Sequence, residues 1–121
     1  VGAIPGDAVM HERPVGRGYV AVVETAGHPW GAGAERHGHE FHHSSLDHLD
    51  PAVGFAYEVR RGHGVDGRHD GVRVHNVVAS YLHQRSTGGN GWAQRFVAFV
   101  RAKRDARRAA QRSAAVEPVL A

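Results

Sequence analysis

The chain of 121 residues contains no cysteine, and this absence excludes several kinds of site. Without thiols these residues cannot form a disulfide framework, a thiolate zinc site or an iron–sulfur cluster. They also cannot supply a cysteine nucleophile. No apolar run approaches the roughly 20 residues that span a bilayer, and the first residues lack the pattern of a secretory signal. We therefore expect a cytoplasmic domain, or a piece of one, that does not enter a membrane.

Acidic side chains are scarce near the C-terminal end, where Asp105 stands among six basic residues between positions 101 and 112. The rest of the chain has nine basic and eleven acidic residues, so the formal charge of +3 comes from this stretch. A basic helix end could contact nucleic acid, but it is also typical of a solvated helix. We favour the solvated helix and do not expect a nucleic-acid partner.

Segments rich in β-branched and aromatic residues predict strands. They cover residues 18–24, 37–44, 54–60, 72–75 and 77–83. In the third of them, Phe55, Tyr57 and Val59 fall on one face by the two-residue period. The glycine-rich connections at 25–34 and 62–71 are predicted to be loops.

From Trp92 onward the apolar period changes to 3.6 residues, which predicts a helix. Its apolar stripe consists of Trp92, Phe96, Phe99 and Val100. Because Lys103 and Ala106 continue the same face, we expect the helix to dock by its first three turns and then extend into solvent, with a frayed end at 114–121. Several strands followed by one long helix indicate a portion of an α/β domain, since a complete doubly wound domain would alternate regularly.

Four histidines lie within residues 37–43, with Glu40 among them. On a strand His37, His39 and His43 would share a face, and neutral imidazoles bind zinc, copper or nickel. The segment could instead be a strand that lines a catalytic cleft, or a polar surface. The residues alone leave these three interpretations open.

Two glycine-rich segments could in principle hold a phosphate or another anion. Residues 62–67 read G-x-G-x-x-G, but a strand is predicted after them, whereas a dinucleotide site needs a helix there. We therefore predict a hairpin loop whose glycines adopt positive φ. Residues 87–91 precede the predicted helix, so their amides could hold an anion, but an ordinary strand-to-helix turn is the simpler interpretation.

His83 ends the apolar segment 77–83, directly before a polar loop. In α/β folds, ligands and catalytic groups lie at strand ends. The nearby hydroxyls of Ser80, Ser86 and Thr87 are not part of a Gly-x-Ser-x-Gly elbow. The sequence therefore supplies His83 with no catalytic partner, and a structural role stays open.

Two motifs in combination resemble a known family. They are Gly38-His-Glu-Phe-His42 with Ser44, and Asn76-Val-Val-Ala-Ser-Tyr-Leu-His83. Both are similar to the C-terminal half of the glutamine amidotransferase domain of cobyrinic acid a,c-diamide synthases. Residues 2–20 and 95–97 extend the likeness over about 1–101. The resemblance implies a flavodoxin-like class I amidotransferase fold, with 1–101 as a partial amidotransferase domain and 102–121 as a basic helix end and frayed tail.

In that family a cysteine attacks the side-chain amide of glutamine and a histidine activates the cysteine; His83 matches this catalytic histidine. The ammonia released amidates a corrinoid carboxylate that an upstream ATP-binding domain has activated, with magnesium present. The resemblance therefore implies glutamine and a tetrapyrrole as substrates, and an N-terminal amidotransferase half and an ATP-binding domain as partners. ATP and magnesium are implied for the full-length enzyme only. This chain alone is predicted to be inactive.

Two departures from the family pattern bear on the substrate. His43 stands where the family usually has tyrosine, and Gln-Arg-Ser at 84–86 replaces Leu-His-Phe. The second change is closer to relatives that amidate siroheme, so cobyrinate and siroheme both remain candidate substrates. The resemblance also favours the cleft interpretation, with His39, Glu40 and His42 on a cleft-lining strand and no metal. A histidine-rich metal-binding module remains the alternative, and a nucleic-acid-binding fragment using residues 101–112 is a third possibility.

Overall fold

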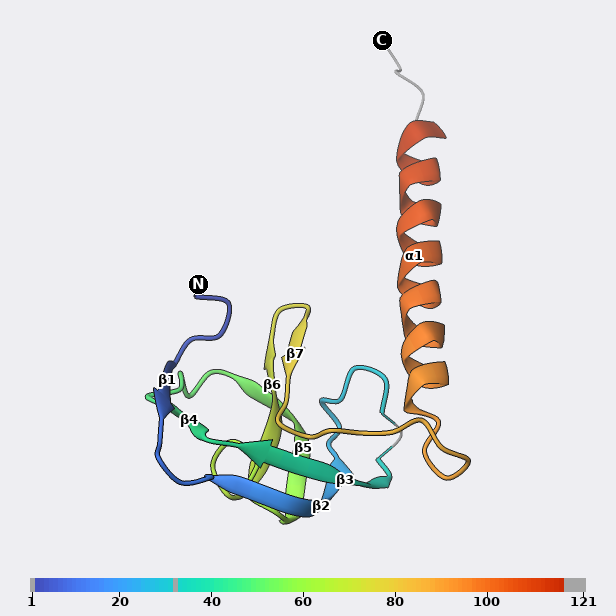
Figure 1. The fold of residues 1–121 in the computed structure, drawn as a ribbon. Helices are drawn as coiled ribbons and strands as arrows, with labels where there is room; N and C mark the ends of the chain where they lie inside the picture. The colour runs from blue at the N-terminus through green and yellow to red at the C-terminus, as the bar shows by residue number, and fades with distance from the viewer. Residues whose placement is uncertain (1, 32, 117–121) are drawn as a thin grey trace.

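The computed structural model describes residues 2–31 and 33–116, which form two antiparallel sheets and a helix (Figure 1). The strands are β1 (Asp7–Met10), β2 (Gly16–Glu24), β3 (Glu35–His42), β4 (Ser44–Asp47), β5 (Gly54–Arg61), β6 (His69–Val74) and β7 (Val77–Ala79). The helix α1 (Trp92–Val116) follows them. The predicted order of several strands and then one C-terminal helix is confirmed.

The larger sheet has the strand order β3-β2-β5-β6-β7, and the smaller sheet pairs β1 with β4. All the strand pairs among the described residues are antiparallel. Short loops join the consecutive pairs β2–β3, β5–β6 and β6–β7. The loop between β2 and β3 agrees with the predicted loop at 25–34. The loop predicted at 62–71 was too long, because β6 begins at His69 and not at residue 72. Gly62, Gly64 and Gly67 all have positive φ, so the prediction of a hairpin loop there is confirmed.

The predicted strand at 37–44 was wrong at its end, because the chain changes sheets at His43. Strand β3 pairs with β2 up to His42, and β4 then pairs with β1, which the sequence analysis did not predict. All four residues of β1 are exposed, so this strand has no buried apolar face from which a period could be recognised.

The predicted strand at 77–83 was also too long, since β7 ends at Ala79. The backbone amides of Tyr81 and Leu82 donate to the side chain of Asp70, at 3.2 and 3.1 Å. These two amides are therefore not part of the β6–β7 ladder. Residues 80–82 leave the sheet and lead to His83, which pairs with β3 instead.

The core of the larger sheet is small. Val22, Ala56 and Tyr57 are buried, and Val59, Val78 and Leu82 pack against them. The predicted alternation in β5 is present only in part, since Ala56 is fully buried beside Tyr57. Because adjacent residues of a strand point to opposite faces, both faces of the sheet are covered at this point of β5.

Helix α1 stands beside the sheets and projects away from them (Figure 1). Its first turns contact the loop between β2 and β3, where the ring of Trp30 lies 5.1 Å from that of Phe96 and 5.5 Å from that of Phe99. The prediction that the helix docks by its first turns and then extends into solvent is confirmed, because residues 100–116 are exposed. The sequence analysis predicted a frayed end over 114–121. This prediction was wrong for 114–116, which are helical, and 117–121 lie outside the described residues. No helix in the described part of the chain is long and apolar enough to cross a membrane.

Candidate active site

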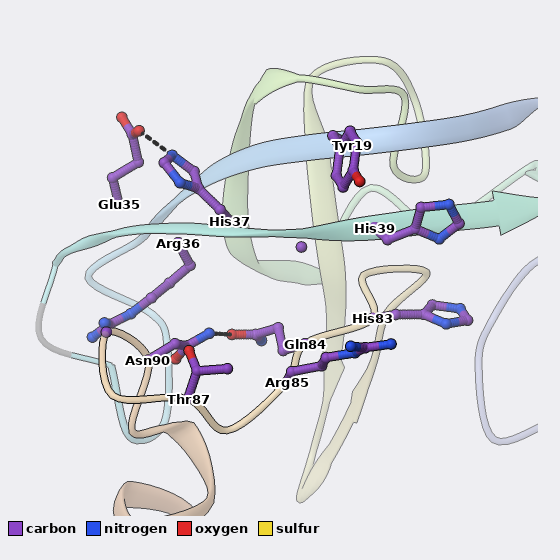
Figure 2. Close-up of a pocket in the computed structure, with 12 residues that line it drawn as sticks. Tyr19, Glu35, Arg36, His37, His39, His83, Gln84, Arg85, Thr87 and Asn90 are labelled. Carbon is purple, nitrogen blue, oxygen red and sulfur yellow. Dashed lines mark hydrogen bonds and ion pairs between the residues drawn. The ribbon is translucent and has the colours of Figure 1, made fainter.

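The segment that follows β7 runs along the free edge of β3, and between them lies an open pocket of about 720 Å³ (Figure 2). Polar and basic side chains line most of it. The lining residues are Tyr19, Glu35, Arg36, His37, Gly38, His39, His83, Gln84, Arg85, Thr87, Gly89 and Asn90. Of these residues, the sequence analysis singled out His83, His39 and His37, and the segment 84–86 that includes Arg85. It did not point to Tyr19 or Arg36, because a pocket built from three separate segments leaves no local sequence signal.

His83 is held against β3 through its main chain. Its amide donates to the carbonyl of His39 at 2.7 Å, and the amide of His39 donates to the carbonyl of His83 at 3.0 Å. The two imidazole rings are 6.2 Å apart and point in the same direction, with Tyr19 on the other side of His39 (Figure 2). The side chain of His83 is exposed, so it can meet a reactant that enters the pocket.

Gly38 allows the close approach of these two segments. A Cβ atom at this position would lie 2.4 Å from the carbonyl oxygen of His83 and 2.6 Å from a side-chain carbon of Leu82. Any other residue would therefore push the segment that carries His83 away from β3. This glycine lies in the first motif quoted above, and its contact explains why a side chain is not tolerated there.

Glu40 and His42 lie on the opposite face of β3 from His39, because successive side chains of a strand alternate. The carboxylate of Glu40 is buried and accepts hydrogen bonds from the amides of His63 and Gly64 at 2.7 and 2.9 Å. His42 lies 3.3 Å from the same carboxylate, and its ring stacks on Tyr81 with centroids 3.6 Å apart. Of the three residues predicted on a cleft-lining strand, His39 lines the pocket, and Glu40 and His42 support the strand from behind.

Asp70 is the functional candidate that the sequence analysis did not single out. It lies on β6, is 2% exposed, and accepts four hydrogen bonds. One oxygen accepts from the amides of Gly71 and Tyr81, and the other accepts from the hydroxyl of Ser80 and the amide of Leu82. Burial raises the pKa of Asp70, and these hydrogen bonds oppose that shift. The sequence analysis placed Asp70 in the predicted loop at 62–71, so nothing there distinguished it from the other polar residues of a loop.

A second polar network holds the residue after His83. The side-chain amide of Gln84 donates to the hydroxyl of Tyr57 at 3.0 Å, and its oxygen accepts from Asn90 at 3.0 Å. The Tyr57 hydroxyl also lies 3.0 Å from Nε2 of His28. Burial raises the pKa of Tyr57 and lowers the pKa of His28. Gln84 therefore belongs to a partly buried chain of hydrogen bonds.

The histidine cluster does not converge on one point. His37 pairs with Glu35 at 2.7 Å on the surface, and His43 lies beyond the end of β3, where it is 3.3 Å from the carbonyl of His11. The alternation that would have placed His43 beside His37 and His39 ends where β3 ends. In residues 2–31 and 33–116, no three histidine, aspartate or glutamate side chains are arranged to hold a metal ion.

The glycine-rich segment before α1 is an ordinary turn, as predicted. Thr87 and Asn90 exchange two backbone hydrogen bonds of 3.2 and 2.9 Å. Two of its amides are therefore used within the turn. The helix begins directly after it, at Trp92.

Comparison with known proteins places this arrangement in a family. Residues 1–90 match the CobB/CobQ-like glutamine amidotransferase domain. The chain is 44% identical over 101 residues to the cobyrinate a,c-diamide synthase of Magnetococcus marinus, covering 83% of this chain and 22% of that protein. It is 34% identical over 89 residues to the synthase of Haloarcula marismortui, covering 73% of this chain and 20% of the relative.

The corresponding protein of Halobacterium salinarum is 36% identical over 83 residues, covering 68% of this chain and 19% of the relative. The chain thus spans about a fifth of the length of these curated relatives. No solved structure matches the chain.

The class that the domain match defines is that of the glutamine amidotransferases. More closely, the chain belongs to the CobB/CobQ-like family, whose domain is a flavodoxin-like class I fold, and it is similar to cobyrinate a,c-diamide synthases. The predicted resemblance is confirmed. The match ends at residue 90, so both quoted motifs lie within it.

Proposed function

We propose that the chain is the C-terminal part of an ATP-dependent amidotransferase that hydrolyses glutamine and amidates carboxylates of a tetrapyrrole, with cobyrinate or siroheme as the acceptor. The observation that supports this most directly is the placement of His83. The histidine that matches the catalytic histidine of the family is exposed at the rim of a pocket and is fixed to β3 by two backbone hydrogen bonds. A cytoplasmic location is part of the same proposal.

In this proposal His83 moves protons in both half-reactions. Its imidazole takes the proton of a cysteine thiol from another part of the protein, and the thiolate attacks the amide carbon of glutamine. The imidazolium then gives the proton to the departing nitrogen as the C–N bond breaks and ammonia leaves. Water next attacks the thioester, with His83 as the base, which releases glutamate and restores the thiol.

The charges of the pocket suit substrates that carry carboxylates. Arg85 contributes an exposed cation to the lining, whereas Arg36 is paired with Glu24 at 2.8 Å and His37 with Glu35 at 2.7 Å. Basic groups in a cleft favour the binding of acids through hydrogen bonds and charge. Both glutamine and a tetrapyrrole acceptor have carboxylates.

The described residues do not fit ATP. The G-x-G-x-x-G segment is a hairpin loop that leads into β6 and not into a helix, so no helix N-terminus faces it. We therefore assign ATP and magnesium, and the activation of the acceptor, to another part of the enzyme.

The proposal predicts the activity of a chimera in which this chain replaces its matched segment in the Magnetococcus marinus synthase. The chimera should hydrolyse glutamine, and His83→Ala should reduce kcat by at least about 100-fold, because general acid–base catalysis contributes that much. Ammonia release measures the rate. The isolated 121-residue chain should release none.

A matched control is His75→Ala, since His75 is exposed in the turn between β6 and β7 and does not line the pocket. It should leave the rate unchanged. Ammonia release by the chain alone, or a His83→Ala chimera as active as the unmutated one, would refute the assignment.

A further inference from the structure

We propose that Asp70 is a positioning residue that directs the chain after β7 towards β3 and so places His83 at the pocket. This inference rests on the proposed function, because it concerns the histidine assigned to proton transfer. Asp70 is 13 positions before His83 in the sequence and does not itself line the pocket.

The first step of the argument is the distance that the chain must cover. Strand β7 is at one edge of the larger sheet and β3 is at the other, yet four residues after Ala79 the chain is paired with β3. Four residues span at most roughly 14 Å. The two edges of the sheet are therefore close together, and residues 80–82 bridge them.

The second step is that one carboxylate holds all three bridging residues. Asp70 accepts from the hydroxyl of Ser80 at 2.9 Å, from the amide of Tyr81 at 3.2 Å and from the amide of Leu82 at 3.1 Å. The hydroxyl of Ser80 also accepts from the amide of Leu82 at 3.0 Å. A buried carboxylate with this set of donors fixes the backbone path of the bridge.

The third step concerns the path that the chain would otherwise take. Residues 77–83 have the apolar pattern of a continuous strand. The β6–β7 register pairs Val72 with Ala79 and Val74 with Val77. Extended in the same register, it would place Tyr81 opposite Asp70 and His83 opposite Arg68, directly before β6. His83 would then lie beside the start of β6 and not beside β3. The carboxylate of Asp70 takes the amides of residues 81 and 82, which directs the chain away from this extension.

The test begins with Asp70→Asn. Asparagine has the same shape but one acceptor oxygen in place of two, so two of the four donors lose their acceptor. In the chimera we expect kcat for glutamine hydrolysis to fall about 100-fold, as for a misplaced catalytic group, while the KM for glutamine stays nearly unchanged. In the 121-residue chain, NMR should show loss of the contact between the backbones of His39 and His83 and faster exchange of the Tyr81 and Leu82 amides.

Two further variants separate positioning from general stability. Ser80→Ala removes the hydrogen bond that the hydroxyl donates to Asp70 and the one that it accepts from the Leu82 amide, while the other three bonds to Asp70 stay. Because Ser80 is exposed, we expect the chain to keep its fold, and kcat should fall by a smaller factor in the same direction. Asp66→Asn removes a carboxylate that accepts from the amides of Arg68 and His69 but does not contact the bridge. It should leave kcat and the His39–His83 contact unchanged.

Unchanged kcat and an unchanged His39–His83 contact in Asp70→Asn would overturn the proposal. If that variant does not fold, the same result in Ser80→Ala would overturn it. If the unmutated chimera does not hydrolyse glutamine, the proposed function fails, and the NMR contact still decides whether Asp70 positions His83.

Discussion

At the scale of single residues, the buried His28 shows how a tautomer is chosen. The amide of Trp30 donates to Nδ1 of His28 at 3.2 Å, so this nitrogen carries no proton. The proton of the neutral ring is then on Nε2, which donates to the hydroxyl of Tyr57. If Nδ1 were protonated, its N–H would face the N–H of the Trp30 amide, and neither could accept a hydrogen bond from the other. Burial acts in the same direction and lowers the pKa of His28.

This environment predicts a specific pH dependence of stability. Because the folded-state pKa is below the unfolded value of 6.5, the unfolded chain binds the proton first as the pH falls. The contribution of His28 to the free energy of unfolding is therefore complete above pH 6.5 and is lost as the pH falls through the folded-state pKa. For one proton, the free energy of unfolding falls by no more than about 1.4 kcal/mol per pH unit. Urea denaturation between pH 8 and pH 5 measures it.

The comparison variant is His28→Gln, whose amide can accept from Trp30 and donate to Tyr57 without titrating. The difference in unfolding free energy between the two proteins should decrease as the pH falls. A difference that is the same at both ends of the range would contradict the interpretation.

At the scale of elements, α1 is attached to the sheet by a buried ion pair and an aromatic contact. The side chain of Glu24 is completely buried in β2, and one of its oxygens accepts from Arg36 at 2.8 Å and from Arg95 at 2.7 Å. Arg95 is on the second turn of α1, and Trp30 packs on the next turns. The helix itself has no buried residue among those described, so these contacts determine where it lies.

Removal of one cation from this cluster should loosen the helix. We expect Arg95→Ala to lower the free energy of unfolding by about 1–3 kcal/mol, because hydrogen bonds to a buried charge are lost. Hydrogen exchange of the amides in 92–99 should become faster. Arg104→Ala is the control, since Arg104 pairs with Asp105 at 2.9 Å on the exposed part of the same helix and should cause no measurable change. Equal effects of the two variants would show that the buried pair does not anchor α1.

At the scale of the whole molecule, the first turns of α1 contact Trp30 and Glu24, and the rest of the helix is solvated. The division into 1–101 and 102–121 stays a prediction, since α1 runs through that boundary without interruption. All the residues from 102 to 116 are exposed. Lys103 lies over the ring of Phe99, but this contact is within the same helix.

Removal of residues 102–121 should therefore change the free energy of unfolding by less than about 0.5 kcal/mol, as for other changes at exposed positions. Denaturant unfolding of the two lengths of chain measures this. The hydrogen exchange of the amides in β2 and β5 serves as the control, because it should be identical in both. A loss of several kcal/mol would mean that the basic helix end packs on the sheets.

Much of the fold could be predicted because local patterns carry it. Strand β5, the helix that begins at Trp92 and the glycine turn between β5 and β6 each depend on near neighbours in the chain, and each was predicted as the correct type of element. The end of β7 and the pairing of β1 with β4 could not be predicted. Both depend on contacts between residues far apart in sequence, such as the 2.8 Å bond between His11 and Ser45.

The same division applies to the candidate site. The sequence by itself determined the family, the matching histidine and the absence of a thiol, since residue identity alone decides them. Only the tertiary structure decided that His83 lies beside His39 and not at the end of a strand, that Glu40 and His42 face away from the pocket, and that Asp70 holds the bridge. The physical reason is that a buried carboxylate can bind backbone amides ten or more residues away, and no periodicity of side chains records such a contact.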